Sequence, residues 1–209
     1  MRKFVTSGVL ALALSTQAML AESSGGFIGV DLAKTNLSIA DIPTLNGGTT
    51  EALLQDNNTF GLVGGYNFFF AKNVGVRVYA QLNHYTATAI LVNNISAPES
   101  ILNIFANADL LWNAYASEET SAGLFAGISA GATLHYNSTG FIGDMSGLDL
   151  GINAGFRTRF ATHHGLEFFS RFGVIGPEVK ESSPNGAILG TSATILQPFS
   201  YGVRYTFSF

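Results

Sequence analysis

Three residues of this 209-residue chain have the side chains of a hydrolase triad, namely Ser129, His135 and Asp109. In such a triad the base takes the proton of the nucleophilic hydroxyl, so the two groups must lie within hydrogen-bond distance. Ser129 and His135 are six residues apart in a segment with a strand pattern, which separates them by about 20 Å. The spacing therefore argues against nucleophilic catalysis by these residues.

Two histidine motifs remain as candidates for chemistry. His84 and Thr86 share one face of an extended segment, and His84-Tyr85-Thr86 is loosely similar to the His-x-Ser motif of barrel lipid A deacylases. Thr stands where that motif has Ser, and no carboxylate is evident on the same face to orient the histidine, so we expect an interfacial polar residue. Adjacent histidines on an extended chain point apart, which disfavours a metal site at His163 and His164. We predict no catalytic residue, no cofactor and no metal.

The elements that carry these residues are expected to be strands, because apolar and polar side chains alternate along most of the chain. In residues 74–83, Val, Val, Val, Ala and Leu share one face, while Gly, Arg, Tyr, Gln and Asn share the other. Successive side chains of a strand point to opposite faces, and no helix produces this pattern. The same alternation runs through 124–135, 148–160 and 199–209, and with less contrast through 27–37, 58–70, 101–116 and 165–175. A helix stays open as an alternative for 101–116 alone.

The connections between these eight segments alternate in length. Short turns are expected at 71–73, 117–120 and 161–164, and long loops at 38–57, 86–100, 137–146 and 176–196. Outer-membrane barrels have short periplasmic turns and longer extracellular loops. The sequence therefore predicts an all-β fold, an eight-stranded antiparallel up-and-down transmembrane β-barrel.

Composition supports a surface that faces lipid. The chain is 47% apolar and only 11% charged, against about 25% charged in soluble domains, and its mean hydropathy is +0.29. After the first two dozen residues there is no apolar stretch of the about 20 residues that a membrane helix needs. The net charge of −4 offers no basic field for nucleic acid, and the absence of cysteine excludes a disulfide scaffold.

Nine charged residues fall on the polar register of their strands. They are Asp31, Arg77, Asp109, Asp149, Arg157, Arg159, Glu167, Arg171 and Arg204. An arginine that pointed into lipid would cost about 2–4 kcal/mol, so we predict that the nine form a lumen charge network. Because the interior of an eight-stranded barrel is just wide enough for side chains, this network favours a filled barrel over a channel.

Other residues complete the expected barrel. Glycines on the polar register are expected to make room for the long arginines: Gly61, Gly65, Gly127, Gly131, Gly151, Gly155, Gly173 and Gly202. Aromatic residues are expected on the lipid face: Phe60, Tyr66, Phe68, Trp112, Phe156, Phe168, Phe172, Tyr201, Tyr205 and Phe207. Lys34 lies on the apolar register near a strand end, from which it can reach lipid headgroups.

The first 21 residues read as a secretory signal peptide. A basic start at Arg2 and Lys3 precedes a short apolar run and a small-residue exit, a pattern typical of export signals. We expect cleavage after Ala21, with Ala18 as the second choice. The barrel domain is then residues 22–209.

The two ends of the barrel domain resemble known families. Tyr201, Val203, Tyr205, Phe207 and Phe209 look like the last-strand signal that outer-membrane proteins present to the barrel-assembly machinery. The segment 26–31 resembles the first strand of small barrels of the OmpA/OmpX type, and both ends resemble Hop/Hor-type outer-membrane proteins of epsilonproteobacteria.

The resemblance implies an exported, multi-pass protein of the cell outer membrane of a Gram-negative bacterium. Its expected partners are outer-membrane lipid and lipopolysaccharide, the assembly machinery, and a host or surface ligand bound through the loops. These families include adhesins, surface-defence proteins and pores. We expect a non-enzymatic protein acting in envelope structure, adhesion or surface interaction, with a narrow pore and a lipid-modifying enzyme as alternatives.

Overall fold

The strands expected from alternation are present in the computed structural model, which describes residues 22–43, 49–90, 96–137, 145–176, 178–179 and 193–209. They are β1 (Gly25–Pro43), β2 (Thr49–Ala71), β3 (Val74–Ile90), β4 (Ser96–Ala116), β5 (Ser121–Asn137), β6 (Met145–Phe160), β7 (His164–Ile175), β8 (Glu178–Val179) and β9 (Ala193–Ser208). Within these ranges no helix is long and apolar enough to cross a membrane. The segment 101–116, for which a helix was the alternative, lies in β4.

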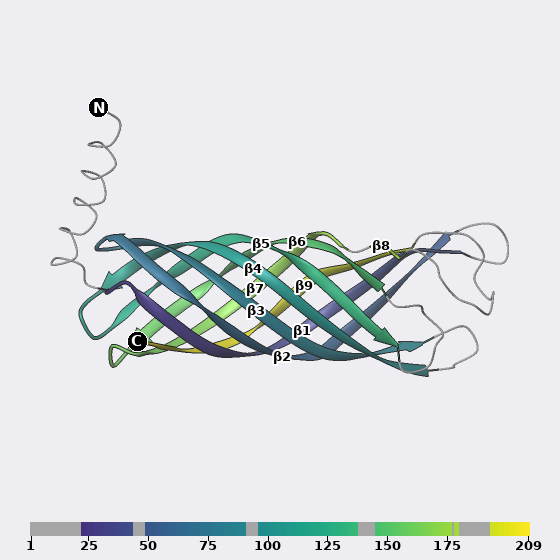
Figure 1. Cartoon of the computed structure of the whole chain (residues 1–209), viewed down its shortest axis with the longest axis horizontal. Helices are drawn as coiled ribbons and strands as arrows, with labels where there is room; N and C mark the ends of the chain where they lie inside the picture. The colour runs from purple at the N-terminus through teal and green to yellow at the C-terminus, as the bar shows by residue number, and fades with distance from the viewer. Residues whose placement is uncertain (1–21, 44–48, 91–95, 138–144, 177, 180–192) are drawn as a thin grey trace, which may run out of the picture.

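From β1 to β7 each strand pairs antiparallel with the next, β7 pairs with β9, and the sheet closes on itself through β1 and β9. The two-residue β8 and the longer β7 both pair with β9, at different heights along it. Together they therefore occupy one strand position of the barrel. The result is the predicted closed eight-stranded antiparallel barrel, seen from the side in Figure 1. Closure matters in lipid because it leaves no sheet edge with unpaired backbone groups.

The two faces of the wall differ as the alternation predicts. All ten aromatic residues expected on the lipid face have outward, solvent-accessible side chains, each at least 38% exposed. Most side chains at the alternate positions are polar or charged and are buried inside, together with aromatic rings such as those of Phe105 and Phe125. The apolar surface inferred from composition is therefore the outer wall of the barrel.

The expected long loops were too long, because the strands continue well into them. β1 and β2 remain paired out to Pro43 and Thr49, and β3 and β4 out to Ile90 and Ser96. Beyond the lipid both faces of a strand meet water, so backbone pairing continues there without a strict two-residue alternation. The residues left between these strands, 44–48, 91–95, 138–144 and 180–192, lie outside the described part, as does the expected signal peptide.

The short turns are where the sequence placed them, and they gather at one end of the barrel with Gly25 and the C-terminus, on the left in Figure 1. The turn between β6 and β7 holds Ala161 at a φ of 49° and Thr162 at a φ of 66°. Both values lie in the left-handed region, which side chains other than glycine seldom adopt. This end is called the turn end below, and the opposite end the outer end.

Candidate functional site: the barrel interior

The structure places all nine charges of the expected lumen network inside the barrel, none more than 5% exposed. They come from six of the nine strands: β1, β3, β4, β6, β7 and β9. The contacts divide them into a central cluster, an Arg171 cluster and a turn-end cluster.

In the central cluster, two arginines share one glutamate. Arg77 on β3 lies 2.7 Å from Asp109 of β4 and 2.5 Å from Glu167 of β7, measured between nitrogen and oxygen. Arg204 on β9 donates to both carboxylate oxygens of Asp31, at 2.7 and 3.1 Å, and lies 3.4 Å from Glu167. A row of alternating charges thus crosses the lumen from β4 to β1. Paired in this way, arginines and carboxylates lose much of the penalty of burial.

Aromatic rings pack against the same arginines. The guanidinium carbon of Arg77 lies 4.8 Å from the ring centres of Tyr79 and Phe125, and that of Arg204 lies 4.9 Å from those of Tyr79 and Phe169. Cation–π contacts of this kind gain strength when the cation is desolvated. Phe125 and Phe169 lie on the polar register of their strands, but the sequence analysis did not predict them as lumen residues.

Arg171 on β7 forms the second cluster with β5 and β6. It pairs with Asp149 at 2.5 Å, and its Nε donates to the hydroxyl of Ser129 at 2.9 Å. Thr133 also donates to Asp149, at 3.1 Å. Ser129 therefore serves as an acceptor for an arginine, in agreement with the argument against a triad.

The turn-end cluster contains a carboxylate that the sequence reading missed. Glu22 precedes β1 and is 2% exposed. Its carboxylate accepts hydrogen bonds from Arg157 at 2.7 and 3.0 Å, from Asn113 at 2.8 Å and from Ser121 at 2.8 Å. Burial opposes ionisation of Glu22, yet Arg157, helped by Ser121 and Arg159, outweighs it and keeps the pKa of this carboxyl below its ordinary value.

Glu22 was overlooked because it sits between the expected signal peptide and the first strand. The sequence did contain a signal for a further carboxylate. The nine predicted residues include five arginines but only four carboxylates, so one more acidic partner was to be expected. Arg159, in the same cluster, donates to the backbone carbonyls of Thr162 and Glu118 at 2.9 and 3.1 Å. The cluster therefore ties the N-terminal segment to two of the turns.

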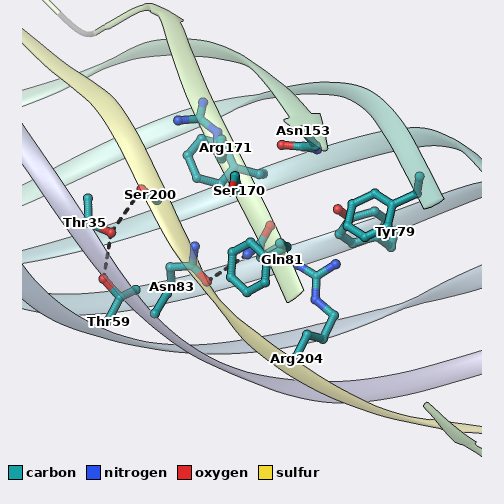
Figure 2. A pocket seen from close by; sticks show the side chains of 14 residues that line it. Thr35, Thr59, Tyr79, Gln81, Asn83, Asn153, Ser170, Arg171, Ser200 and Arg204 are labelled. Atoms are coloured by element: carbon teal, nitrogen blue, oxygen red, sulfur yellow. Dashed lines mark hydrogen bonds between the residues drawn. The ribbon is translucent and has the colours of Figure 1, made fainter. Parts of the chain in front are cut away.

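The interior leaves little free space among these clusters. The lumen holds a cavity of about 20 Å³, and Figure 2 shows side chains that border it, among them Tyr79, Gln81, Asn153, Arg171 and Arg204. On its other side, hydroxyls join three strands: Thr35 and Thr59 lie 2.8 Å apart, and Ser200 donates to Thr35 at 3.1 Å. A space of this size holds about one water molecule.

Most inward glycines face neighbours other than arginines. A methyl group at Gly151 would lie 2.7 Å from the guanidinium carbon of Arg171, so this glycine does make room for an arginine. At Gly155 the methyl would lie 2.5 Å from the ring of Phe125, and at Gly131 2.6 Å from the ring of Phe105. Backbone carbonyls or side chains other than arginine are the nearest neighbours at Gly61, Gly65, Gly127 and Gly202. The expectation about glycines was therefore wrong at Gly61, Gly65, Gly127, Gly131, Gly155 and Gly202.

The histidine motifs are separate from the interior. His84 faces outward, and its Nε2 lies 2.7 Å from the hydroxyl of Ser100 on the neighbouring strand. At the turn end, Nδ1 of His163 lies 2.8 Å from the carbonyl of Ser208, and Nδ1 of His164 lies 2.6 Å from the hydroxyl of Tyr205. In the described ranges no three histidine, aspartate or glutamate side chains are grouped so that they could hold a metal ion.

The five residues of the expected assembly signal lie at the C-terminal end. Their side chains point outward from β9 or follow it, with exposed fractions of 36–72%. The last of them, Phe209, donates its backbone N–H to the carbonyl of Gly26 at 3.0 Å. This bond joins the end of the chain to the start of β1.

Comparisons with known proteins place the chain among outer-membrane barrels. The family model described as Helicobacter outer membrane protein matches residues 61–209. The outer membrane protein OprG from Pseudomonas aeruginosa has a similar structure, with a TM-score of 0.59 and 13% identity over 91% of this chain and 99% of that one. Neisserial surface protein A (NspA) gives a TM-score of 0.53 and 12% identity over 90% and 100%. At such identities the likeness concerns the fold alone. No curated protein sequence matches the chain.

Proposed function

The chain belongs to the Helicobacter outer membrane protein family, and from this premise we propose a non-enzymatic role played by the surface that its outer end presents beyond the membrane. The role is one in envelope structure, adhesion or contact with another surface. One observation carries the proposal. Within the described strands the middle of the barrel is filled by ion pairs and rings, and the cavities beside them measure about 20 and 40 Å³, which is room for a few water molecules rather than for a solute.

The length of the strands supports an external surface. A strand needs about 9–11 residues to cross a membrane, whereas β1 and β2 have 19 and 23 residues and β3 and β4 have 17 and 21. The residues beyond that length extend from the outer end of the barrel as two hairpins, one formed by β1 with β2 and the other by β3 with β4. Such hairpins hold a binding surface in place better than a free loop, because their backbone is already hydrogen-bonded.

The test shortens one hairpin and leaves the barrel intact. Leu37 pairs with Leu54, so replacing residues 38–53 by Asn-Gly closes β1 and β2 on a tight turn. The same replacement of residues 87–99 shortens the second hairpin, between the paired Thr86 and Ser100.

Bacteria that display each variant are compared with wild type for adhesion to epithelial cells and to a solid surface. The proposal expects a several-fold loss of adhesion for at least one shortened hairpin, at equal amounts of folded barrel. Unchanged adhesion for both variants, together with an unchanged envelope, would count against it.

One contact favours lipid modification as a second candidate function. Nε2 of His84 and the hydroxyl of Ser100 are 2.7 Å apart, which is the hydrogen-bond distance that a general base and its nucleophile need. Both residues lie on the outer wall. The test is release of fatty acid from outer-membrane lipid by the purified barrel. Activity that disappears in His84→Ala and Ser100→Ala would establish this function, and no release by wild type would end it.

A further inference from the structure

A short N-terminal strap crosses the turn end of the lumen. It consists of residues 22–24, which precede β1 and belong to no strand. The hydroxyl of Ser24 accepts the backbone N–H of Phe69 on β2 at 2.9 Å, which holds this end of the strap against the wall next to β1. The carboxylate of Glu22 instead accepts a hydrogen bond from Ser121 of β5, at 2.8 Å. Because β5 lies opposite β1 in a closed sheet of eight strand positions, the strap reaches across the mouth of the lumen.

The side chains that receive Glu22 are held in place by contacts that do not involve the strap. Arg157 donates to the side-chain oxygen of Asn113 at 3.0 Å, and its guanidinium carbon lies 5.7 Å from the ring centre of Phe69. Ser121 is 1% exposed and begins β5. These three side chains, called the carboxylate receptor below, are therefore arranged by the barrel wall and not by Glu22.

The receptor matches a carboxylate in geometry and charge. It donates four hydrogen bonds to Glu22: two from Arg157 and one each from Asn113 and Ser121. Two N–H groups of one guanidinium fit the two oxygens of a carboxylate, and the charges strengthen these bonds. Arg159 adds a second cation, 3.8 Å from the same carboxylate.

The strap can leave the receptor without opening the sheet. The carboxylates of the predicted lumen network belong to paired strands, whereas Glu22 lies outside every strand. The expected cut after Ala21 makes Glu22 the first residue of the mature chain, so the strap is then attached at Gly25 alone. A cavity of about 40 Å³ borders Glu22 and Ser23, which leaves room for water beside the strap.

We propose that the carboxylate receptor is a binding site, and that the N-terminal strap is a detachable latch that occupies it with Glu22. The docked latch closes the mouth of the lumen and covers Ser121. The undocked latch leaves Arg157 open to a carboxylate from solution. Glu22 is the favoured occupant because its short tether keeps it at an effective concentration of about millimolar, which a free carboxylate must exceed.

The experiment measures how well the latch covers residue 121. The chain has no cysteine, so Ser121→Cys gives a single thiol and keeps Arg157 and Asn113, which make three of the four bonds. The rate of labelling by a maleimide is measured on the refolded barrel 22–209 in an uncharged detergent. It is compared with the same chain carrying Glu22→Gln and with a chain that begins at Gly25. A gel-mobility assay first confirms that each barrel is folded.

Two control variants separate the latch from general effects on the turn end. Glu119→Gln removes a carboxylate that is exposed in the turn between β4 and β5. Thr120→Cys places the thiol on an exposed neighbour of residue 121. We expect slow labelling of residue 121 with the latch present and labelling at least about tenfold faster in Glu22→Gln and in the chain without the strap, because the charge-assisted bonds are lost. Glu119→Gln should leave the slow rate unchanged, and Thr120→Cys should react equally fast in every chain.

Acetate tests the receptor apart from the strap. Added well above the millimolar range, and compared with chloride at equal ionic strength, it should slow labelling of residue 121 in the chain without the strap and leave the chain with the strap unchanged. Equal labelling rates with and without the strap would overturn the latch, and Glu22→Gln decides this point by itself if the shortened chain does not fold. Acetate that protects neither chain, or both equally, would overturn the receptor.

Discussion

Arg77 shows how a single residue is held in the barrel interior. Its guanidinium binds carboxylates of β4 and β7 while its faces contact the rings of Tyr79 and Phe125. A planar cation with several donors can meet all four neighbours at once, which a lysine ammonium cannot. Asp109 depends on this cation for its burial, and Glu167 depends on this cation together with Arg204.

Replacing Arg77 with Met should leave those two carboxylates buried without their shared partner. Breaking a buried ion pair on one side costs about 3–5 kcal/mol, so urea unfolding of the refolded barrel should show a loss of this size. Lys72→Met serves as the control, because Lys72 is exposed in the turn between β2 and β3. Equal stability of Arg77→Met and wild type would mean that the central cluster does not stabilise the barrel.

Glu22 makes part of the stability depend on pH. Because its pKa in the folded protein is below the ordinary value of 4.5, its contribution is complete above that value and is lost as the pH falls through the lower one. At pH 7, Glu22→Gln should therefore destabilise the barrel by about 2 kcal/mol. At pH 3 the difference in thermal stability between variant and wild type should shrink. A difference that stays constant from pH 7 to pH 3 would contradict the ionised state of Glu22.

At the scale of elements, the turn between β6 and β7 is under backbone strain. Ala161 and Thr162 both have positive φ, a conformation that asparagine and glycine adopt more readily. The double change Ala161→Asn with Thr162→Gly keeps the backbone groups that bind Arg159 and Glu119. It should stabilise the barrel by about 1 kcal/mol, measured by urea unfolding. Destabilisation would show that the two original side chains contribute more than their strain costs.

The sequence predicted the parts of the strands that lie in lipid and failed beyond them. Where a strand lies between lipid and lumen it has one apolar and one polar face, so the alternation from Val74 to Asn83 predicts a strand directly. Outside the membrane the two faces are alike, and the continuation of β1 to Pro43 left no periodic signal. Partners across the lumen, such as Arg77 and Glu167, are 90 residues apart, and only the closed barrel brings them together.

At the scale of the whole molecule, a closed sheet with saturated backbone hydrogen bonds should resist detergent. The barrel without residues 1–21 should move faster on a gel before boiling than after, because sodium dodecyl sulfate unfolds it only on heating. Arg77→Met should shift at a lower temperature than wild type. Identical mobility before and after boiling, for protein extracted from membranes, would contradict a closed barrel.

The filled interior is the property that separates a surface protein from a narrow pore. Ion pairs cross the lumen, and the cavities beside them have room for only a few water molecules. The filled interior is tested most directly by single-channel recording of the purified barrel in a planar lipid bilayer at high salt. A filled barrel should give no steady current steps under an applied voltage. Steps of constant conductance from wild-type protein would contradict it and would make conduction the function of this barrel.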